Sequence, residues 1–313
     1  MRIHTARLTA GLLLACALAA THTVNAASPT TSAAPATAST ANSLEAEQEA
    51  AFKAAKAVQK AGPADIPLRD QAHLQLPAGY IWVPTPAAAQ LMHSMGNRTD
   101  DTFIGAIFPT DDNADWMAVV KFVKEGYIKD DDAKDWNADD LLKILKEGTE
   151  AANEERAKRG IPGIEVTGWA QKPQYEAQTH RLVWSALSKK KGSTGENQGV
   201  NYNTYALGRE GYLSLNLITN AKDLDTYKPD AAKLLAALQY DDGKKYADFN
   251  SSTDKVAAYG LAALVAGVAV KKLGLFALAL AFLAKFAKIA VVAGGAALWG
   301  IAKVFKKKKN PEA

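Results

Sequence analysis

Hydrophobic and polar positions alternate most regularly between residues 201 and 218. Leu213, Leu215 and Leu217 are separated by single polar or aromatic residues, so this strand is predicted to have one buried face and one polar face. The preceding residues 208–211 begin and end with glycine, which is typical of a turn. Residues 201–207 and 212–218 are therefore predicted to form a β-hairpin.

Several other short apolar segments lie between turn residues and predict further strands. Apolar and aromatic positions on either side of a Pro-Ala-Gly turn at 77–79 indicate two short strands, with Leu74, Leu76, Tyr80, Trp82 and Val83 as their core positions. The remaining predicted strands cover residues 102–108, 116–123, 165–170, 181–188 and 238–240. An acidic turn at residues 111–115 joins the strands at 102–108 and 116–123.

Residues 137–159 have the clearest helical pattern. Asn137 is the expected N-cap, and two aspartates follow in the first turn, where the helix dipole favours anions. One face is expected to combine Leu141, Leu145, Gly148 and Ala152, and Gly160 is the expected stop signal.

Three further helices are predicted from their ends and their apolar positions. Residues 44–62 stop at a Gly-Pro pair and have a mostly alanine face, so weak docking is expected. Residues 85–96 begin with Thr85 as cap and a proline in the first turn. Residues 229–239 direct Leu234, Leu235 and Leu238 inward.

Antiparallel hairpins with helices between them predict an α+β domain over residues 64–250. The expected architecture is an antiparallel sheet with packed helices, similar to an α/β/α sandwich, followed by a C-terminal transmembrane helical anchor.

The C-terminal region combines apolar blocks with lysines. Between Lys255 and Pro311 the chain has ten lysines and no acidic residue. Apolar residues suit the hydrocarbon of a bilayer and lysines reach its headgroups, so residues 257–305 are predicted to be a membrane anchor followed by a basic tail, 306–313. The predicted anchoring residues are Lys271, Lys272, Lys285, Phe286, Lys288, Trp299, Lys303, Phe305, Lys306, Lys307, Lys308 and Lys309.

Residues 286–305 are the expected span, because twenty residues extend about 30 Å as a helix. Residues 257–284 leave three alternatives, since Lys271 and Lys272 lie near their middle: a second span, a re-entrant hairpin or an interfacial helix. An odd number of spans is expected, because the positive-inside tendency places the basic tail in the cytoplasm. A cationic surface anchor without a span is the remaining alternative.

The N-terminus predicts export. Residues 1–26 have a basic start, a short apolar run and small residues at the end, as in a signal peptide. Lipoprotein processing at Cys16, the single cysteine, is the alternative. Residues 27–43 are rich in Ala, Ser, Thr and Pro and are predicted to be a disordered linker.

The net charge of +4 conceals an acidic body. Residues 27–254 contain 25 basic and 32 acidic residues, so the basic excess lies in the tail. An acidic body argues against nucleic-acid binding.

A set of short motifs, taken in order, is similar to one known family. The motifs are Leu76-Pro77-Ala78-Gly79-Tyr80, residues 153–168, Asn201-Tyr202-Asn203, residues 207–217, Tyr246-Ala247-Asp248-Phe249 and residues 254–260. Over residues 64–309 the chain resembles a bacterial domain-of-unknown-function family of uncharacterised membrane-anchored proteins. The resemblance implies an exported domain with a C-terminal anchor and supplies no catalytic residue. The order of elements also resembles the Mog1/PsbP-like fold, whose members are generally binding or assembly modules.

Candidate catalytic and metal-binding patterns are weak. Asp111, Asn113 and Asp115 have the spacing of an EF-hand start, but Trp116 and Phe122 occupy its glycine and glutamate positions. Residues 130–132 are interpreted as a solvated acidic turn. No catalytic residue, cofactor-binding residue or metal ligand is assigned, and no cofactor is expected.

Three histidines, His73, His93 and His180, lack metal-binding spacing, and His180 is interpreted as a strand-edge residue. A Ser-His-Asp triad stays open as an alternative, since its members can be distant in sequence. Residues 192–199 are read as a mobile loop. Six aromatic residues are interpreted as packing rather than as a ligand cleft: Trp116, Trp169, Tyr175, Trp184, Tyr202 and Tyr205.

The expected function is that of a binding or assembly module on the bacterial inner membrane, with its soluble domain outside the cytoplasm. Two alternatives remain: an envelope hydrolase with Ser/His/Asp chemistry, and a membrane-perturbing stress protein that acts through its lysine-rich tail. The expected partners are the lipid bilayer and another envelope protein or a second copy of the chain, and not nucleic acid.

Overall fold

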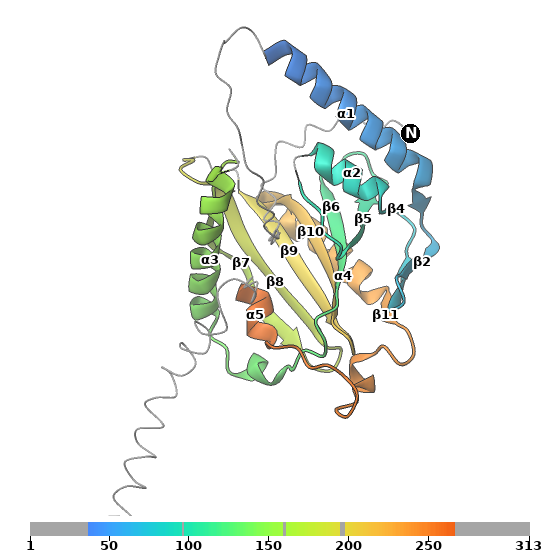
Figure 1. Cartoon of the computed structure of the whole chain (residues 1–313), viewed down its shortest axis with the longest axis vertical. Coiled ribbons are helices and arrows are strands. Elements are labelled where there is room, and N and C mark those ends of the chain that lie inside the picture. Colours follow the sequence, from blue (N-terminus) through green and yellow to red (C-terminus); the bar gives the residue numbers. More distant parts are fainter. Residues whose placement is uncertain (1–36, 96, 159–160, 195–197, 267–313) are drawn as a thin grey trace, which may run out of the picture. The chain divides into compact units, whose positions relative to one another are not determined.

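The computed structural model describes residues 37–95, 97–158, 161–194 and 198–266 (Figure 1). The predicted signal peptide, most of the predicted linker and all of the predicted anchoring residues therefore lie outside the described part of the chain. The chain divides into two units, Met1–Gly267 and Val268–Ala313, and the described residues all belong to the first.

Two antiparallel sheets form the framework of this unit. The larger sheet has the strand order β1-β4-β5-β6-β10-β9-β8-β7, and the smaller has the order β11-β3-β2. The strands of the larger sheet are β1 Lys60–Ala61, β4 Tyr80–Pro84, β5 Phe103–Pro109, β6 Trp116–Val123, β7 Ile164–Glu176, β8 Arg181–Lys190, β9 Gly199–Leu207 and β10 Tyr212–Asn220. The strands of the smaller sheet are β2 Ala64–Leu68, β3 Ala72–Leu76 and β11 Leu238–Tyr240.

Helices cover both faces of the larger sheet. The α-helices are α1 Thr37–Val58, α2 Ala87–Ser94, α3 Ala138–Lys158, α4 Leu224–Ala236 and α5 Leu261–Ala266. Three short 3₁₀ helices are η1 Asp131–Lys134, η2 Ala221–Asp223 and η3 Tyr246–Asp248. The predicted α+β class, with a large antiparallel sheet and packed helices, is confirmed for the described residues.

The predicted β9–β10 hairpin is confirmed, with Tyr212 opposite Leu207 at its closed end. Leu213, Leu215 and Leu217 are buried, as the alternation predicts. The opposite face is less exposed than predicted, because Ser214 is only 3% exposed and lies opposite the half-buried Lys121 of β6. Polar residues on a central strand are thus covered by neighbouring elements instead of facing solvent.

The two short strands around residues 77–79 are confirmed, but they belong to different sheets. β3 pairs with β2 and β11, whereas β4 pairs with β1 and β5. The turn between them therefore carries the chain from one layer to the next. This change of layer brings Leu74 and Leu76 over the large sheet, where they join the main core.

The main core lies between the large sheet, the small sheet and α4. It contains Trp82 of β4, Ile107 of β5, Leu215 of β10 and Leu234 of α4, all buried. Burying about 25 cal/mol per Å² of apolar surface makes this layer the principal source of stability.

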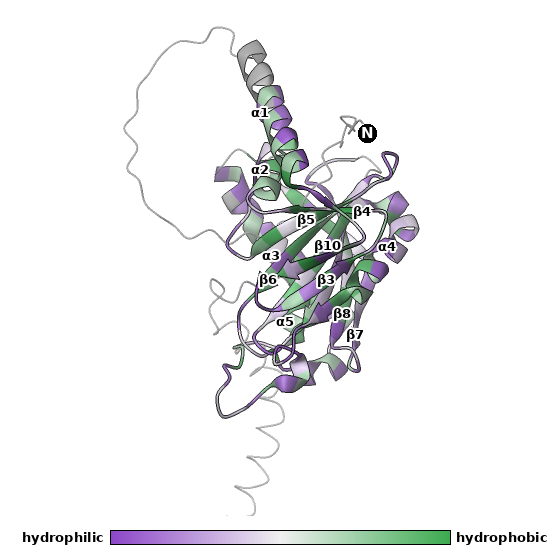
Figure 2. Ribbon diagram, turned by 90° about the vertical axis from the view of Figure 1, so that its right-hand side faces the viewer, coloured by the Kyte–Doolittle hydropathy of each residue, from purple (hydrophilic) through white to green (hydrophobic). Residues whose placement is uncertain are grey.

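The opposite face of the sheet has two helical covers. α1 and α2 pack over β4, β5 and β6, where Val83, Met117 and Val119 form a second core. α3 packs on β7, and the indole N–H of Trp169 donates to the Ala138 carbonyl at the start of α3. Figure 2 shows hydrophobic positions on β4 and β5 beneath α1 and α2, and mixed character along α1.

Two helix boundaries near the N-terminus differ from the prediction. α1 begins at Thr37, inside the predicted linker, and ends at Val58, because Lys60 and Ala61 pair with β4 as strand β1. α2 begins at Ala87, and Thr85 does not cap it: the Thr85 backbone N–H donates to Ile104 of β5. Residues 60–61 and Thr85 therefore bond to neighbouring strands instead of extending or capping a helix.

The predicted N-cap of α3 is confirmed, but the buried face of this helix differs from the predicted one. The Asn137 side-chain oxygen accepts from the backbone N–H groups of Asp139 and Asp140, at 2.8 and 3.2 Å. The buried face continues from Leu145 to Thr149 and Asn153, whereas Gly148 and Ala152 point elsewhere. Asn153 is buried because its amide bonds both the N–H and the carbonyl of Ile164, each at 2.8 Å. Polar contacts therefore determine which residues of α3 are buried, and the spacing of apolar residues does not predict them.

α4 begins five residues earlier than predicted and ends sooner. Leu224 is buried at its start, and Pro229 lies inside the helix. A proline removes one backbone donor, and burial of the helix outweighs that loss here. Leu234 and Leu235 face the core as predicted, while Leu238 belongs to β11 and pairs with Leu74.

The folded unit also continues past the predicted domain end at residue 250. Residues 261–266, which were predicted to be part of the membrane anchor, form α5 and pack against α3 and η1. Leu261 and Val265 are fully buried. Apolar side chains satisfy burial against a protein surface as well as in lipid, so composition alone did not separate the two environments.

Candidate functional site

An apolar groove lies between α1, α2 and the adjoining edge of the large sheet. It contains a cavity of about 150 Å³. Its apolar lining comes from α1, β4, α2, β5 and β6, from the residue that follows α2 and from the loop that follows β5: Phe52, Ala55, Ile81, Val83, Leu91, Met95, Phe108, Pro109, Ala114, Trp116 and Met117. This groove is the most distinct candidate for a binding site in the described part of the chain.

α1 contacts the second core through two buried alanines and the half-buried Phe52. Ala51 and Ala55 are buried against the second core, and Val58 of the same helix is 44% exposed. Outside the core contact, α1 is held by polar contacts to α2: the Gln48 side-chain amide donates to the Ser94 carbonyl, and Glu47 lies 2.8 Å from His93. Alanine allows close approach but fills little volume, so space remains beside it.

Acidic residues form one wall of the groove. Asp111, Asp112 and Asp115 line it, and Lys56 of α1 is the single cation among the lining residues. The loop has a fixed shape, because Asp111 Oδ1 accepts from the Asn113 backbone N–H at 2.9 Å and Asp115 Oδ2 accepts from Asn220 at 2.9 Å. The predicted acidic turn is thus confirmed as a turn, and it places carboxylates beside an apolar surface.

A second feature is the segment that leads to the C-terminal region. We call residues 255–266 the exit strap. Tyr127 forms a parallel bridge with Val256: its N–H donates to the Lys255 carbonyl and its carbonyl accepts from Ala257, both at 2.8 Å. Gly126 has φ +102°, and a Cβ there would lie 2.5 Å from the Lys255 oxygen, so glycine is required for this close approach.

The carboxylate of Asp132 holds the start of α5. Its two oxygens accept from the backbone N–H groups of Leu261 and Ala262, each at 3.0 Å. Gly260 is adjacent, and a Cβ on it would lie 2.5 Å from the same carboxylate. Asp132 therefore caps α5 from a distant part of the chain, and the interpretation of residues 130–132 as a solvated turn is wrong.

Aromatic rings stack on one another beside the start of the exit strap. Tyr127 stacks on Phe249 and on Tyr246, with ring centroids 3.9 and 4.4 Å apart, and His180 lies 4.2 Å from the Tyr246 ring. The Tyr246 hydroxyl donates to the Ile128 carbonyl at 2.8 Å. Burial raises the pKa of Tyr246 above its usual range, so the hydroxyl stays protonated as a donor.

His180 is a turn residue and not the predicted strand-edge residue. Its φ of +52° is uncommon for a non-glycine residue, and its Nδ1 lies 3.1 Å from the Tyr175 hydroxyl. Tyr175 donates to Asp130 at 2.7 Å. Burial, followed by this contact with Asp130, raises the pKa of the Tyr175 hydroxyl. The network supports the exit strap through the Tyr246 ring.

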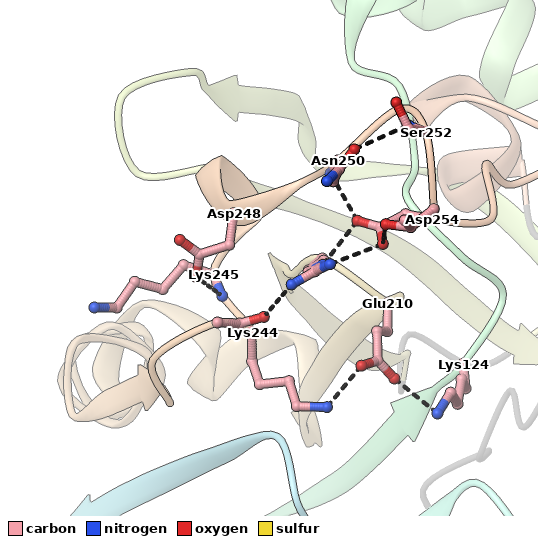
Figure 3. Close-up of polar contacts among 11 residues, drawn as sticks. Lys124, Glu210, Lys244, Lys245, Asp248, Asn250, Ser252 and Asp254 are labelled. Atoms are coloured by element: carbon pink, nitrogen blue, oxygen red, sulfur yellow. Dashed lines mark hydrogen bonds and ion pairs between the residues drawn. The ribbon is translucent and has the colours of Figure 1, made fainter.

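Ion pairs fix the hairpin turn between β9 and β10 beside the strap. Arg209 binds Asp254 through two bonds of 2.7 and 2.9 Å, and the guanidinium lowers the pKa of that carboxyl well below its usual range. Glu210 lies between Lys124 and Lys244, at 2.7 and 2.6 Å (Figure 3). The Arg209–Asp254 pair therefore ties the residue directly before the strap to the β9–β10 turn.

The other candidate residues from the sequence are dispersed. His73 contacts Asp65, His93 contacts Glu47, and no histidine in the described ranges contacts a serine hydroxyl. Among those residues no group of three metal-ligating side chains converges. Trp116, Trp184, Tyr202 and Tyr205 are buried, and Trp169 packs edge-on against Trp184, as the packing interpretation predicts. Trp116 also lines the groove.

The predicted anchoring residues, Lys271 to Lys309, lie outside the described residues. Among the residues that the structure describes, no helix is long and apolar enough to cross a bilayer. The sequence did not indicate the groove or Asp132. Two signals were available: the Tyr259-Gly260 pair before the apolar run, and the acidic turn directly before an aromatic strand start.

Comparison with solved structures finds low overall overlap. The cyanobacterial PsbP from Synechocystis sp. PCC 6803 matches 58% of this chain and 91% of its own length, with 13% identity and a TM-score of 0.35. A mutant of the protein Mog1 matches 56% of this chain and 94% of its own length, with 10% identity and a TM-score of 0.27. Both are proteins to which the order of elements had pointed.

None of the curated proteins matches the chain. One family model does match, over residues 60–295, which is most of the chain and includes every strand described above. The chain therefore belongs to the family described as "Protein of unknown function (DUF2167)".

Proposed function

We propose that this protein is a binding module that its C-terminal region holds at a bacterial membrane, with the folded body outside the cytoplasm. The observation that carries the proposal is the exit strap. The described chain ends in α5, directly before the lysine-rich apolar region in the sequence, and α5 is buried against α3 and capped by Asp132. The last described residues before the lysine-rich region are thus part of the folded unit.

The arrangement of the body supports presentation of the groove. In both views α5 lies toward the end of the unit opposite α1 and α2 (Figures 1 and 2). The groove and the exit strap are therefore separate features of the folded unit, and no residue that lines the groove belongs to the strap. The apolar blocks with flanking lysines supply the membrane affinity, and residues 1–26 supply export.

Membrane fractionation tests this proposal. The full chain is expected in the membrane pellet after an alkaline wash, whereas a chain that ends at Ala266 is expected in the soluble fraction. Reporters fused after Ala313 then test the expected odd number of spans, with activity in the cytoplasm only. Release of the full chain by the wash would overturn the membrane tether.

A matched pair of variants separates membrane attachment of the full chain from docking of the exit strap on the folded unit. Asp132→Ala is expected to leave the full chain in the membrane but to make residues 255–266 sensitive to protease. Asp131→Ala changes an exposed neighbour in the same 3₁₀ helix and is the control. Equal protease resistance of the two variants would show that Asp132 does not hold the exit strap against the folded unit.

A further inference from the structure

We propose that the groove between α1, α2 and residues 110–115 binds a helix of another protein that presents one large apolar side chain a helical turn away from a lysine or arginine. The proposal names the partner class of the binding module and so rests on the proposed function. It goes beyond it in assigning a site and a recognition chemistry.

The size of the cavity limits the apolar part of the partner. At about 150 Å³ it is much smaller than a helix, and it equals the volume of engineered apolar cavities that hold a single benzene ring. Phe52, Ile81, Val83 and Leu91 surround it. One leucine, phenylalanine or methionine side chain therefore fills the space, and the rest of the partner lies on the surface outside.

The charge of the wall determines the polar part. Asp111 and Asp112 are exposed, and Asp112 has neither a hydrogen-bond nor an ion-pair partner among the described residues. Asp115 adds a third carboxylate that Asn220 holds in place. A cationic side chain next to the apolar anchor gains attraction from this wall. An anionic lipid headgroup would be repelled, which favours a peptide over a phospholipid.

The walls also favour a helix over an extended strand. β4 is already paired on both sides at Ile81 and Trp82, so an added strand finds no free edge there. On the α1 side the groove is lined by the side chains of a helix, among them Phe52, Ala55 and Lys56. Because the backbone groups of a helix interior are already bonded within the helix, this wall suits a partner whose own backbone hydrogen bonds are also satisfied, as they are in a helix. An incoming helix would pack beside α1 with its anchor in the cavity, as in other helix-in-groove complexes.

Labelled peptides of about 16 residues test the chemistry, because shorter helices are marginal in water. One peptide carries phenylalanine and lysine one turn apart on an alanine and glutamine background. Two matched peptides replace the phenylalanine by alanine or the lysine by glutamate. The full chain in detergent micelles is expected to bind the first peptide about tenfold more tightly than either control, a difference of about 1.4 kcal/mol. Equal affinity for the lysine and glutamate peptides overturns the proposal.

Variants of the chain locate the site. The double change Asp111→Asn and Asp112→Asn is expected to weaken the lysine peptide about tenfold and to leave a glutamine version of it unchanged. Asp131→Asn, at an exposed acid on η1, is the matched control and should change neither. Ala55→Leu narrows the cavity and should weaken both peptides, while Val58→Leu on the exposed side of the same helix should not. An unfolding curve for each variant verifies that α1 stays docked.

The two proposals fail separately. If the alkaline wash releases the full chain but the peptide ranking holds, the tether is wrong and the groove assignment stands. If the chain stays in the membrane and no peptide discriminates, or the double variant binds like the control, the groove assignment is wrong.

Discussion

α1 and α5 both attach a terminal segment to the same body, and they do so in opposite ways. α1 has 22 residues and contacts the core through alanines, with polar contacts to α2. α5 has six residues, of which Leu261 and Val265 are fully buried and two backbone N–H groups are bound by Asp132. The longer helix leaves a cavity beside it, whereas the shorter one is fixed at its start.

The difference shows that helix length does not decide how firmly a segment docks. Buried volume per residue and satisfied terminal donors decide it, because most helical stability in proteins comes from tertiary packing. The short helix before the lysine-rich tail is buried and capped, whereas a cavity lies beside the long helix that lines the groove.

The largest effect is expected from removing buried volume in α5. Leu261→Ala should lower the free energy of unfolding by about 2–5 kcal/mol, since Leu261 is fully buried. Val58→Ala in α1 removes an exposed side chain and should change it by less than about 0.5 kcal/mol. Chemical unfolding of the full chain, followed by tryptophan fluorescence, measures both. Similar losses for the two variants would contradict the comparison.

Loss of the cap should have the next largest effect. Asp132→Ala removes both acceptors from the start of α5 and is expected to cost about 1–2 kcal/mol. Hydrogen exchange should become faster at Leu261 and Ala262 and stay unchanged in α1. Asp131→Ala is the control. Unchanged exchange at Leu261 would mean that packing alone holds the strap.

The Arg209–Asp254 pair should give the strap a pH dependence. Arg209 lowers the pKa of Asp254 in the folded chain, so its stabilising contribution is present above about pH 4 and is lost as the pH falls through the folded-state value. Asp254→Asn should therefore be less stable than the natural chain near neutral pH, and the gap should narrow in acid. Unfolding midpoints over an acid series measure it. A constant gap would assign the effect to packing.

The smallest effect is expected at the surface contact of α1. Glu47→Gln removes the exposed pairing with His93, and pairs of this kind contribute about 0–1 kcal/mol. Its unfolding midpoint should lie within error of the natural chain, and added salt should not change the difference. A larger loss would show that α1 is docked more firmly than its alanine face indicates.

Sequence patterns were informative wherever a single period determined the outcome. The β9–β10 hairpin, β5, β6 and the Asn137 cap follow from alternation or from local capping chemistry. Patterns were less informative where two elements compete for the same residues. The Thr85 backbone joins the sheet instead of starting a helix, and Asn153 replaces Ala152 on the inner face of α3 because it bonds Ile164.

By itself the sequence determined the α+β class, the family membership, the acidic body and the lysine-rich apolar C-terminal region. Each of these depends on composition, order of motifs or short-range periodicity. Tertiary structure alone decided that β3 and β4 enter different sheets, that Asp132 caps a helix 129 residues away, and that alanines on α1 leave a cavity beside an acidic wall. The reason is physical: these features arise from contacts between distant residues, and local patterns do not encode the free energy of such contacts.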